Sequence, residues 1–200
     1  MSSQLILASE SAARRRLLKR LGLKFKAIAP SIDESAFQKK IKSPQKLVRV
    51  LAEEKARVVA HRFPQSVVIG SDQMLVLGKK VFGKPITAAN ACKQLQMCSG
   101  KWITLITGVA IIGSSKTGKP VSETFVHSTK MKFRKLSETE IEAYVRLDQP
   151  LWCAGSFMFE KRGISLFHRV ETDDPSAIEG FPLLYVNEVL RANFPDLFVG

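Results

Sequence analysis

The sequence lacks any apolar run that approaches the roughly 20 residues of a transmembrane helix. Met1–Leu7 is too short for a signal peptide, and the charges that follow it do not fit one. No membrane partner is therefore expected. The absence of a signal, together with an odd number of cysteines, predicts reduced thiols and a cytoplasmic protein.

Residues that bind transition metals are also few. The three cysteines show no metal or redox spacing, and the three histidines are scattered without forming a ligand pair. A zinc site is therefore not expected. These residues are Cys92, Cys98, Cys153, His61, His127 and His168.

Acidic residues are scarce, with 18 Asp and Glu against 31 Lys and Arg, which gives a formal net charge of +13. Such a balance favours polyanions such as nucleotides, nucleic acid or anionic surfaces, although it also serves solubility. The basic residues are spread along the whole chain and form no tail. This distribution argues against a dedicated nucleic-acid arm.

The composition that remains is that of a globular protein. Two hundred residues, 45% of them hydrophobic, suit one domain over residues 1–200, or two closely fused lobes. Strands and helices alternate, with one long hairpin inserted, so we expect a mixed α/β sheet covered by helices. The expected strands are Gln4–Ala8, Phe25–Ala29, Val67–Leu77 with an interruption at Asp72, Val81–Phe82, Trp102–Ile112, Val121–Phe133 and Gly163–Phe167. The expected helices are Ala12–Leu21, Pro44–Arg62, Thr87–Cys98, Ser137–Leu147 and Phe181–Asn193.

The stretch Val67–Pro85 carries the first unusual residue, because Asp72 interrupts an apolar strand. Asp is depleted in strands, since its side chain competes for backbone hydrogen bonds. The alternative is a turn Asp followed by a solvated Lys84. Gly78–Lys84 copies most of a phosphate-binding P-loop, as does Gly113–Lys119, but each ends in Pro and neither leads directly into a helix. We reject both as phosphate sites.

Three further sites carry charges in unexpected places. Arg14, Arg15 and Arg16 crowd the start of a helix capped by Ser11, where the helix dipole disfavours cations. A bound anion would explain them, whereas arginines that point into solvent are the alternative. Glu54 and Lys55 fall inside the apolar arc of their helix, so they pair internally, or the lysine reaches an edge or a phosphate. Asp33 and Glu34, expected in a loop, would hold a divalent cation if they lie beside Asp72.

Taken together and in order, these motifs resemble the Maf family of nucleoside triphosphate pyrophosphatases, in particular the subgroup that acts on 7-methyl-GTP. The motifs are Ser9-x-Ser11-x-x-Arg14-Arg15, Asp33-Glu34, Ala52-Glu53-Glu54-Lys55-Ala56, Gly70-Ser71-Asp72-Gln73, Gly83-Lys84-Pro85, Ser99-Gly100-Lys101 and Cys153-Ala154-Gly155-Ser156-Phe157. They cover nearly the whole chain.

The resemblance implies an elongated α/β fold of two lobes with an active-site cleft between them, often as a homodimer. It implies hydrolysis of the α–β phosphoanhydride with a divalent cation, Mg²⁺ or Mn²⁺. Residue by residue, it makes Asp72 the catalytic base and a metal ligand together with Glu34. It makes Ser11, Arg14, Lys55 and Lys84 substrate-binding residues, and it ties Gln73 and Glu160 to base specificity.

One position departs from the pattern. The resemblance predicts an aromatic residue where this sequence has Ala13. An aromatic ring there would stack on the cationic 7-methylguanine, and Ala13 cannot do so. The alternative substrates are therefore dTTP or UTP for a related pyrophosphatase. The strongly basic composition leaves a second alternative, a basic nucleic-acid-binding module without catalysis.

Overall fold

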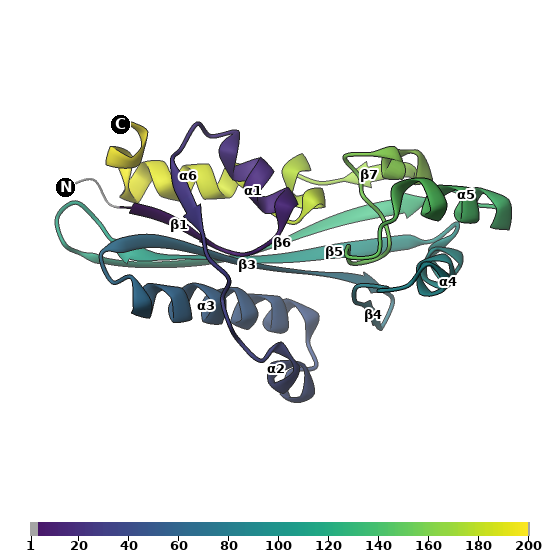
Figure 1. Ribbon diagram of the computed structural model, residues 1–200, viewed down its shortest axis with the longest axis horizontal. Helices are drawn as coiled ribbons and strands as arrows, with labels where there is room; N and C mark the ends of the chain where they lie inside the picture. Colours follow the sequence, from purple (N-terminus) through teal and green to yellow (C-terminus); the bar gives the residue numbers. More distant parts are fainter. Residues whose placement is uncertain (1–3, 200) are drawn as a thin grey trace. The chain divides into compact units, whose positions relative to one another are not determined.

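The computed structural model describes residues 4–199 of the chain and holds helices and strands in alternation (Figure 1). The strands are β1 (Gln4–Ala8), β2 (Phe25–Ala27), β3 (Ser66–Leu77), β4 (Lys80–Phe82), β5 (Trp102–Ser114), β6 (Pro120–Phe133) and β7 (Phe167–Glu171). The α-helices are α1 (Ala12–Lys19), α2 (Glu34–Lys40), α3 (Pro44–Arg62), α4 (Ala88–Cys98), α5 (Glu138–Asp148) and α6 (Leu183–Asn193). Three 3-10 helices complete the list, η1 (Arg162–Leu166), η2 (Pro175–Glu179) and η3 (Pro195–Phe198).

The described strands form one mixed sheet in the order β2-β1-β3-β5-β6-β7, with β4 paired to β3. Strand β1 is parallel to β2 and to β3, whereas the β3–β4 and β6–β7 pairs are antiparallel. The predicted mixed α/β sheet flanked by helices is therefore confirmed. Within the described residues, no helix has the length and apolar character needed to cross a membrane.

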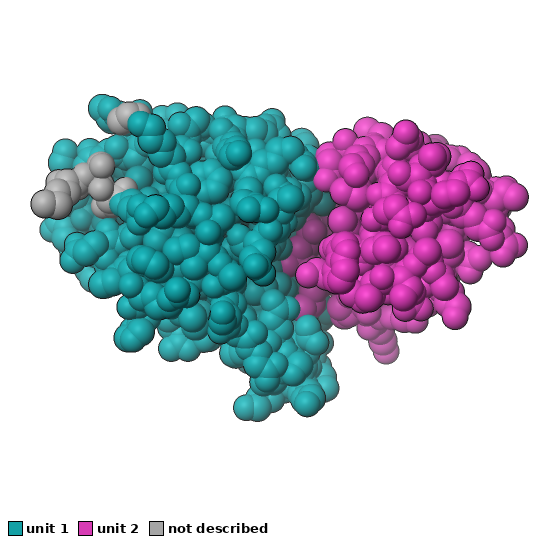
Figure 2. All heavy atoms as spheres, in the orientation of Figure 1, with its two compact units in different colours: residues 1–72, 107–127, 174–200 teal, residues 73–106, 128–173 magenta. Residues whose placement is uncertain are grey.

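The chain divides into two compact units, each built from separate segments (Figure 2). Unit 1 contains residues 1–72, 107–127 and 174–200, and unit 2 contains residues 73–106 and 128–173. Strands β3, β5 and β6 each contribute residues to both units.

The core of unit 1 has two layers, one on each face of the sheet. Side chains alternate along a strand, so Val67 and Ile69 of β3 lie on one face and Val68 on the other. The first face packs against α1 and α6, and the second packs against α3 (Figure 1). This alternation decides which helix each later residue of β3 meets.

Unit 2 is built around a cluster of aromatic rings. Phe133 of β6 lies edge-on to Phe157, with ring centroids 6.1 Å apart, and Phe167 of β7 contacts both rings. Helices α4 and α5 pack against each other in the same unit. Each begins at a side-chain cap, Thr87 for α4 and a Ser137–Glu140 capping box for α5.

Most predicted elements are confirmed within one or two residues, but three predictions are wrong. Asp33 and Glu34 do not lie in a loop, because Asp33 caps the short helix α2 by accepting from the backbone N–H of Ser35. Gly163–Phe167 is not a strand: the segment forms η1, and strand β7 begins only at Phe167. The N–H of Gly163 donates to the Met158 carbonyl, which turns the chain at that point.

Strand β3 also differs from its prediction, because it runs through Asp72 without interruption. Each of the two P-loop-like segments contains a hairpin turn, with Gly78 (φ 60°) in the β3–β4 turn and Gly118 (φ 78°) in the β5–β6 turn. The three cysteines are free thiols, as predicted.

Candidate active site

The parallel strands of unit 1 bring the predicted phosphate-binding and acidic residues to the same end of the sheet. Strand β1 ends with the pair Ala8–Gly70, and the chain then enters α1. Strand β2 ends nearby and leads to α2, while β3 continues past Gly70 to Ser71 and Asp72. Ligand sites in open α/β sheets form at the carboxyl ends of parallel strands, where the loops leave the sheet.

The loop between β1 and α1 is held by two serines. Ser11 caps α1 by accepting from the backbone N–H of Arg14, and the Ser9 hydroxyl accepts from the N–H of Ser11 at 3.2 Å. Ser9 is buried and Ser11 is partly exposed. Ala13 lies in the same first turn, also partly exposed.

Arg14 is fixed by backbone carbonyls rather than by an ion pair. Its Nε donates to the Gly180 carbonyl at 3.0 Å, and its Nη1 donates to the Ser71 carbonyl at 2.9 Å and to the Ser9 hydroxyl. The Gly180 carbonyl also accepts from the Ser71 hydroxyl. Within the described residues, Nη2 of Arg14 has no acceptor, so two N–H donors are free for an anionic ligand.

Helix α3 delivers Lys55 from its buried stripe. The stripe consists of Leu47, Val48, Leu51, Ala52, Lys55, Ala56 and Val59. Glu54 lies outside it, partly exposed, and accepts two hydrogen bonds from Arg57. Of the two charges predicted in the apolar arc, Lys55 is therefore the one that is buried.

Lys55 bridges two carboxylates that are distant in sequence. Its ammonium lies 2.7 Å from Oε1 of Glu34 and 2.7 Å from Oδ1 of Asp72. Lys55 and Asp72 are each 7% exposed, whereas the Glu34 side chain is 45% exposed. An ammonium has three N–H donors, so one remains for a phosphate oxygen.

The site's charges shift its protonation equilibria. Burial raises the pKa of Asp72, and the positive charges of Lys55 and Arg14 partly offset that effect. Burial likewise lowers the pKa of Arg14, and Asp72 and Glu34 oppose the shift. These mutual effects place the two cations and the two carboxylates in one electrostatic cluster.

A glycine allows α3 to approach closely enough for this cluster to form. A Cβ on Gly70 would lie 2.2 Å from the carbonyl oxygen of Ala52 and 2.7 Å from the N of Ala56. Asp72 lies two residues after Gly70 and so faces the same helix. The close contact between β3 and α3 therefore places Lys55 opposite Asp72.

The other predicted site residues belong to unit 2. Gln73 is partly exposed in β3, and Lys84 and Glu160 are exposed in loops. Glu160 and Lys84 act in opposite directions on the pKa of the Cys153 thiol, which burial raises. Both charges therefore lie near the loop that begins at Cys153.

This loop, residues 153–160, is anchored at several points. The Ser156 hydroxyl donates to Gln94 at 2.7 Å, and the N–H of Met158 donates to the Tyr144 hydroxyl at 2.9 Å. Just after the loop, the buried Asp148 accepts from the backbone N–H and the side chain of Arg162. Glu160 thus extends from a loop that is fixed on both sides.

The donor set for a cation consists of carboxylates alone. Within residues 4–199, no group of three or more His, Cys, Asp or Glu side chains is arranged to hold a metal ion. Glu34 and Asp72 nevertheless offer hard oxygen donors around a single position, which the Lys55 ammonium takes in this structure. Mg²⁺ and Mn²⁺ prefer such donors and take further ligands from substrate phosphates and water, so these residues fit a divalent cation.

Three residues of this site were not predicted from the sequence as site residues: Ser9, Ser71 and Gly180. Ser9 and Ser71 stand next to predicted positions, so their motifs gave some signal. Gly180 contributes a backbone carbonyl, and no sequence signal marks a carbonyl acceptor.

The chain is similar to one family model, to a curated protein and to solved structures. The family model described as "Maf-like protein" matches residues 4–193. A curated protein of Nitrosococcus oceani, named 7-methyl-GTP pyrophosphatase, is 42% identical over 194 residues, which cover 96% of this chain and 95% of the relative. Among solved structures, the HAM1 protein from Coxiella burnetii shares 14% identity at a TM-score of 0.49, and Staphylococcus aureus Ham1 shares 12% at 0.49. Each of these two matches covers 95% of this chain and 99% of the other.

Proposed function

Because the chain belongs to the Maf family, we propose that it hydrolyses the α–β phosphoanhydride of a nucleoside triphosphate to the monophosphate and pyrophosphate. The proposed substrate is 7-methyl-GTP, since the relative at 42% identity carries that substrate in its name. The observation that carries the proposal is the Lys55 ammonium held between Glu34 and Asp72 beside the anchored Arg14.

Asp72 acts as the general base. It accepts a proton from water while the water oxygen bonds to the α-phosphorus, and the bond from that phosphorus to the bridging oxygen breaks. Pyrophosphate leaves with the electron pair of that bond. Burial raises the pKa of Asp72, which makes the carboxylate a better proton acceptor.

Cations bind the triphosphate and neutralise its charge, which is most of what phosphoryl transfer requires of a protein. Arg14 offers the two N–H donors of Nη2, and Lys55 offers its third N–H. Ser11 holds the start of α1 in place through its cap and is a proposed substrate-binding residue. Lys84 adds a further positive charge as a proposed phosphate ligand.

A divalent cation, Mg²⁺ or Mn²⁺, would be held by Asp72 and Glu34. When bound, it supplies further neutralisation of phosphate oxygens and lowers the pKa of a bound water. Glu34 is the more exposed of the two carboxylates and is the one that reaches towards solvent.

Base recognition is assigned to Glu160 and Gln73. Guanine presents two donors on its Watson–Crick edge, N1–H and the 2-amino group, and one carboxylate can accept both. A 7-methyl group adds positive charge to the base, which a carboxylate favours. Adenine presents an acceptor at N1, so Glu160 would face a lone pair.

The test is a pyrophosphate-release assay on 7-methyl-GTP, GTP, ATP, dTTP and UTP, each with Mg²⁺ and with Mn²⁺. We expect the monophosphate and pyrophosphate as products, with 7-methyl-GTP preferred. Asp72→Asn should keep the fold and nucleotide binding but lose about 10²–10⁴-fold in kcat, the usual contribution of a general base. Near-normal turnover in a folded Asp72→Asn protein would remove Asp72 from this role.

The same panel separates the alternatives. A preference for dTTP or UTP would keep the reaction and change the substrate, as Ala13 in place of an aromatic residue allows. No turnover of any nucleotide, with tight salt-dependent binding of oligonucleotides, would favour the nucleic-acid module. That module would account for the charge of +13 but not for the buried pair of Lys55 and Asp72.

A further inference from the structure

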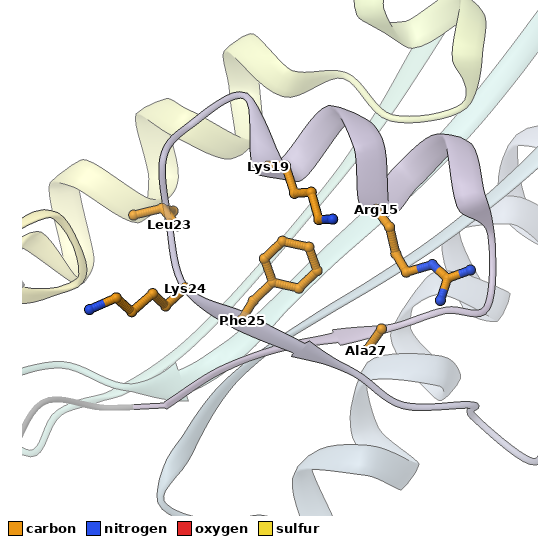
Figure 3. A pocket seen from close by; sticks show the side chains of 6 residues that line it. All are labelled: Arg15, Lys19, Leu23, Lys24, Phe25 and Ala27. Atoms are coloured by element: carbon orange, nitrogen blue, oxygen red, sulfur yellow. The ribbon is translucent and has the colours of Figure 1, made fainter.

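Unit 1 has a basic hollow between helix α1 and the edge strand β2 (Figure 3). Its volume is about 410 Å³, within the range of about 300–1,000 Å³ found for small-molecule sites. The lining residues are Arg15, Lys19, Leu23, Lys24, Phe25 and Ala27. None of them belongs to the cluster around Asp72.

Local geometry explains how these residues come together. Arg15 and Lys19 are four residues apart on α1 and therefore share one face of the helix. Phe25 pairs with Leu5 in the sheet, and Leu5 belongs to the core on the α1 face, so Phe25 faces α1 as well. Gly22 adopts φ 72° in the connecting turn, which brings the chain back beneath the helix.

The hollow has an apolar floor and a cationic wall. Leu23 is buried, and Phe25 is partly buried and packs against the core. Arg15 and Lys19 extend from the helix on the side of the Phe25 ring, and Lys24 extends away from the ring at the rim (Figure 3).

Arg15 and Lys19 differ from the neighbouring arginines in their partners. Of the three consecutive arginines, Arg14 donates to backbone carbonyls and Arg16 pairs with Glu179. Within the residues that the structure describes, neither Arg15 nor Lys19 pairs with a carboxylate. Like charges four residues apart on a helix repel each other, and a bound anion would remove that repulsion.

We propose that this hollow binds one nucleoside phosphate, with the phosphate against Arg15 and Lys19 and the base stacked on the Phe25 ring. Cations alone would accept any polyanion, but the ring adds a face on which a base can stack. A nucleic-acid strand would need several stacking rings along a basic groove, and Phe25 is the single aromatic residue among the lining residues. A mononucleotide therefore fits better than a polymer. The proposal does not depend on hydrolysis at Asp72.

The test uses guanosine 5′-monophosphate, which carries no phosphoanhydride, and follows the backbone amides of the full chain by two-dimensional NMR. We expect shifts concentrated at residues 15–27. The double variant Arg15→Gln/Lys19→Gln should weaken this binding about tenfold, because it removes both charge-assisted contacts. Phe25→Leu should weaken it about fivefold or more, the lower end of what base stacking contributes. The same Phe25→Leu change should leave binding of inorganic pyrophosphate unchanged.

The matched control is Lys26→Gln/Lys119→Gln, which removes two charges elsewhere. Lys26 lies on the opposite face of β2 and Lys119 lies in the β5–β6 turn, so the hollow should be unaffected. Equal weakening by both double variants would overturn the proposal, as would the absence of shifts at residues 15–27. If an oligonucleotide binds more tightly than guanosine 5′-monophosphate and its chemical-shift changes spread beyond the hollow, the proposed ligand is wrong and the site binds a nucleic-acid strand instead. Retained hydrolysis in Arg15→Gln/Lys19→Gln would show that the variant is folded, and failure of hydrolysis in the unaltered protein would count against the proposed function alone.

Discussion

Lys55 and Asp72 illustrate what single residues reveal before a structure is available. Each was conspicuous in the sequence, a carboxylate in an apolar strand and an ammonium in an apolar stripe, because burying a lone charge is costly. The structure pairs them at 2.7 Å and adds Glu34, so each out-of-place charge accounts for the other. The anchoring of Arg14 was not predictable, because its partners are carbonyl oxygens that every residue possesses.

The three thiols provide a chemical test of the loop in unit 2. Cys98 is fully buried, which raises its pKa to about 11, so almost no thiolate exists at pH 8. We expect iodoacetamide to leave Cys98 unmodified in the folded protein at pH 8. Cys92 and Cys153 are partly exposed with pKa values raised by burial, and both should react slowly.

If nucleotide binds near Glu160 and Lys84, it should protect Cys153 from alkylation and leave Cys92 unprotected. Cys92 is the internal control, because it lies on α4 and its nearby charges are Glu138 and Glu142 of α5. Mass spectrometry of digested protein gives both rates in one experiment. Equal protection of Cys92 and Cys153 would indicate a general tightening of unit 2 instead.

Glu160 permits a direct test of base reading. Glu160→Gln keeps the size of the side chain but replaces one acceptor oxygen by a donor and removes the charge. The differences in transition-state binding free energy that favour 7-methyl-GTP over GTP, and both over ATP, should become smaller by about 1–3 kcal/mol. Values of kcat/KM for the three nucleotides measure this. If ATP is already turned over as well as 7-methyl-GTP by the unaltered protein, Glu160 does not read the base.

Among the elements, the ends of helix α3 were the most predictable from the sequence. Its close packing against strand β3 was the least predictable. Ser43 as the cap and Pro44 at the first position define where it begins, and the structure agrees. The short helix α2 was missed because it buries none of its residues, so no apolar stripe marked it. The close approach of α3 to β3 depends on Gly70, whose role becomes visible only when both backbones are placed together.

Gly70→Ala should therefore affect both stability and activity. The new Cβ would meet the backbone of Ala52 and Ala56, so strand and helix must separate at a cost of about 1–3 kcal/mol in the free energy of unfolding. The Lys55–Asp72 contact would lengthen as a result, and kcat should fall. Denaturant midpoints and pyrophosphate release measure the two effects.

Gly83→Ala is the matched control for stability, since a Cβ there has nothing within 4 Å and the backbone φ is not positive. It should be neutral or stabilise the fold by a few tenths of a kcal/mol or more, through a less flexible unfolded chain. An equal loss in both variants would mean that Gly70 matters for flexibility and not for the helix–strand approach.

At the scale of the whole molecule, the net charge of +13 raises the local concentration of any anionic nucleotide. A direct lysine–phosphate contact can be distinguished from the general attraction of the net charge by four substitutions that each remove one positive charge. Lys55→Ala and Lys84→Ala should lower kcat/KM by tenfold or more, about the effect of losing one charge-assisted phosphate contact. Lys116 and Lys119 lie at the β5–β6 turn, where Lys116 pairs with the exposed Asp196, and their substitution by Ala should change kcat/KM less than about twofold.

Small and equal losses in all four variants would mean that the charge acts only as a general field. In that case raising the salt concentration should abolish the losses relative to the unaltered protein, because exposed charges are screened within about 10 Å at 0.1 M. A large effect of Lys55→Ala that persists at high salt would indicate a direct, buried contact.

The hydrogen bond between Arg14 and the Gly180 carbonyl joins residues 166 positions apart, so the two partners are synthesised at different times. A ribosome adding about 5–20 residues per second reaches Gly180 roughly 10–30 s after Arg14. During that interval Leu17 and Leu18 of α1 lack the side chains of α6 that share their core cluster. We expect a nascent chain stalled before Gly180 to lack the anchored Arg14, so that this site is assembled after most of the protein has been made, not while it emerges.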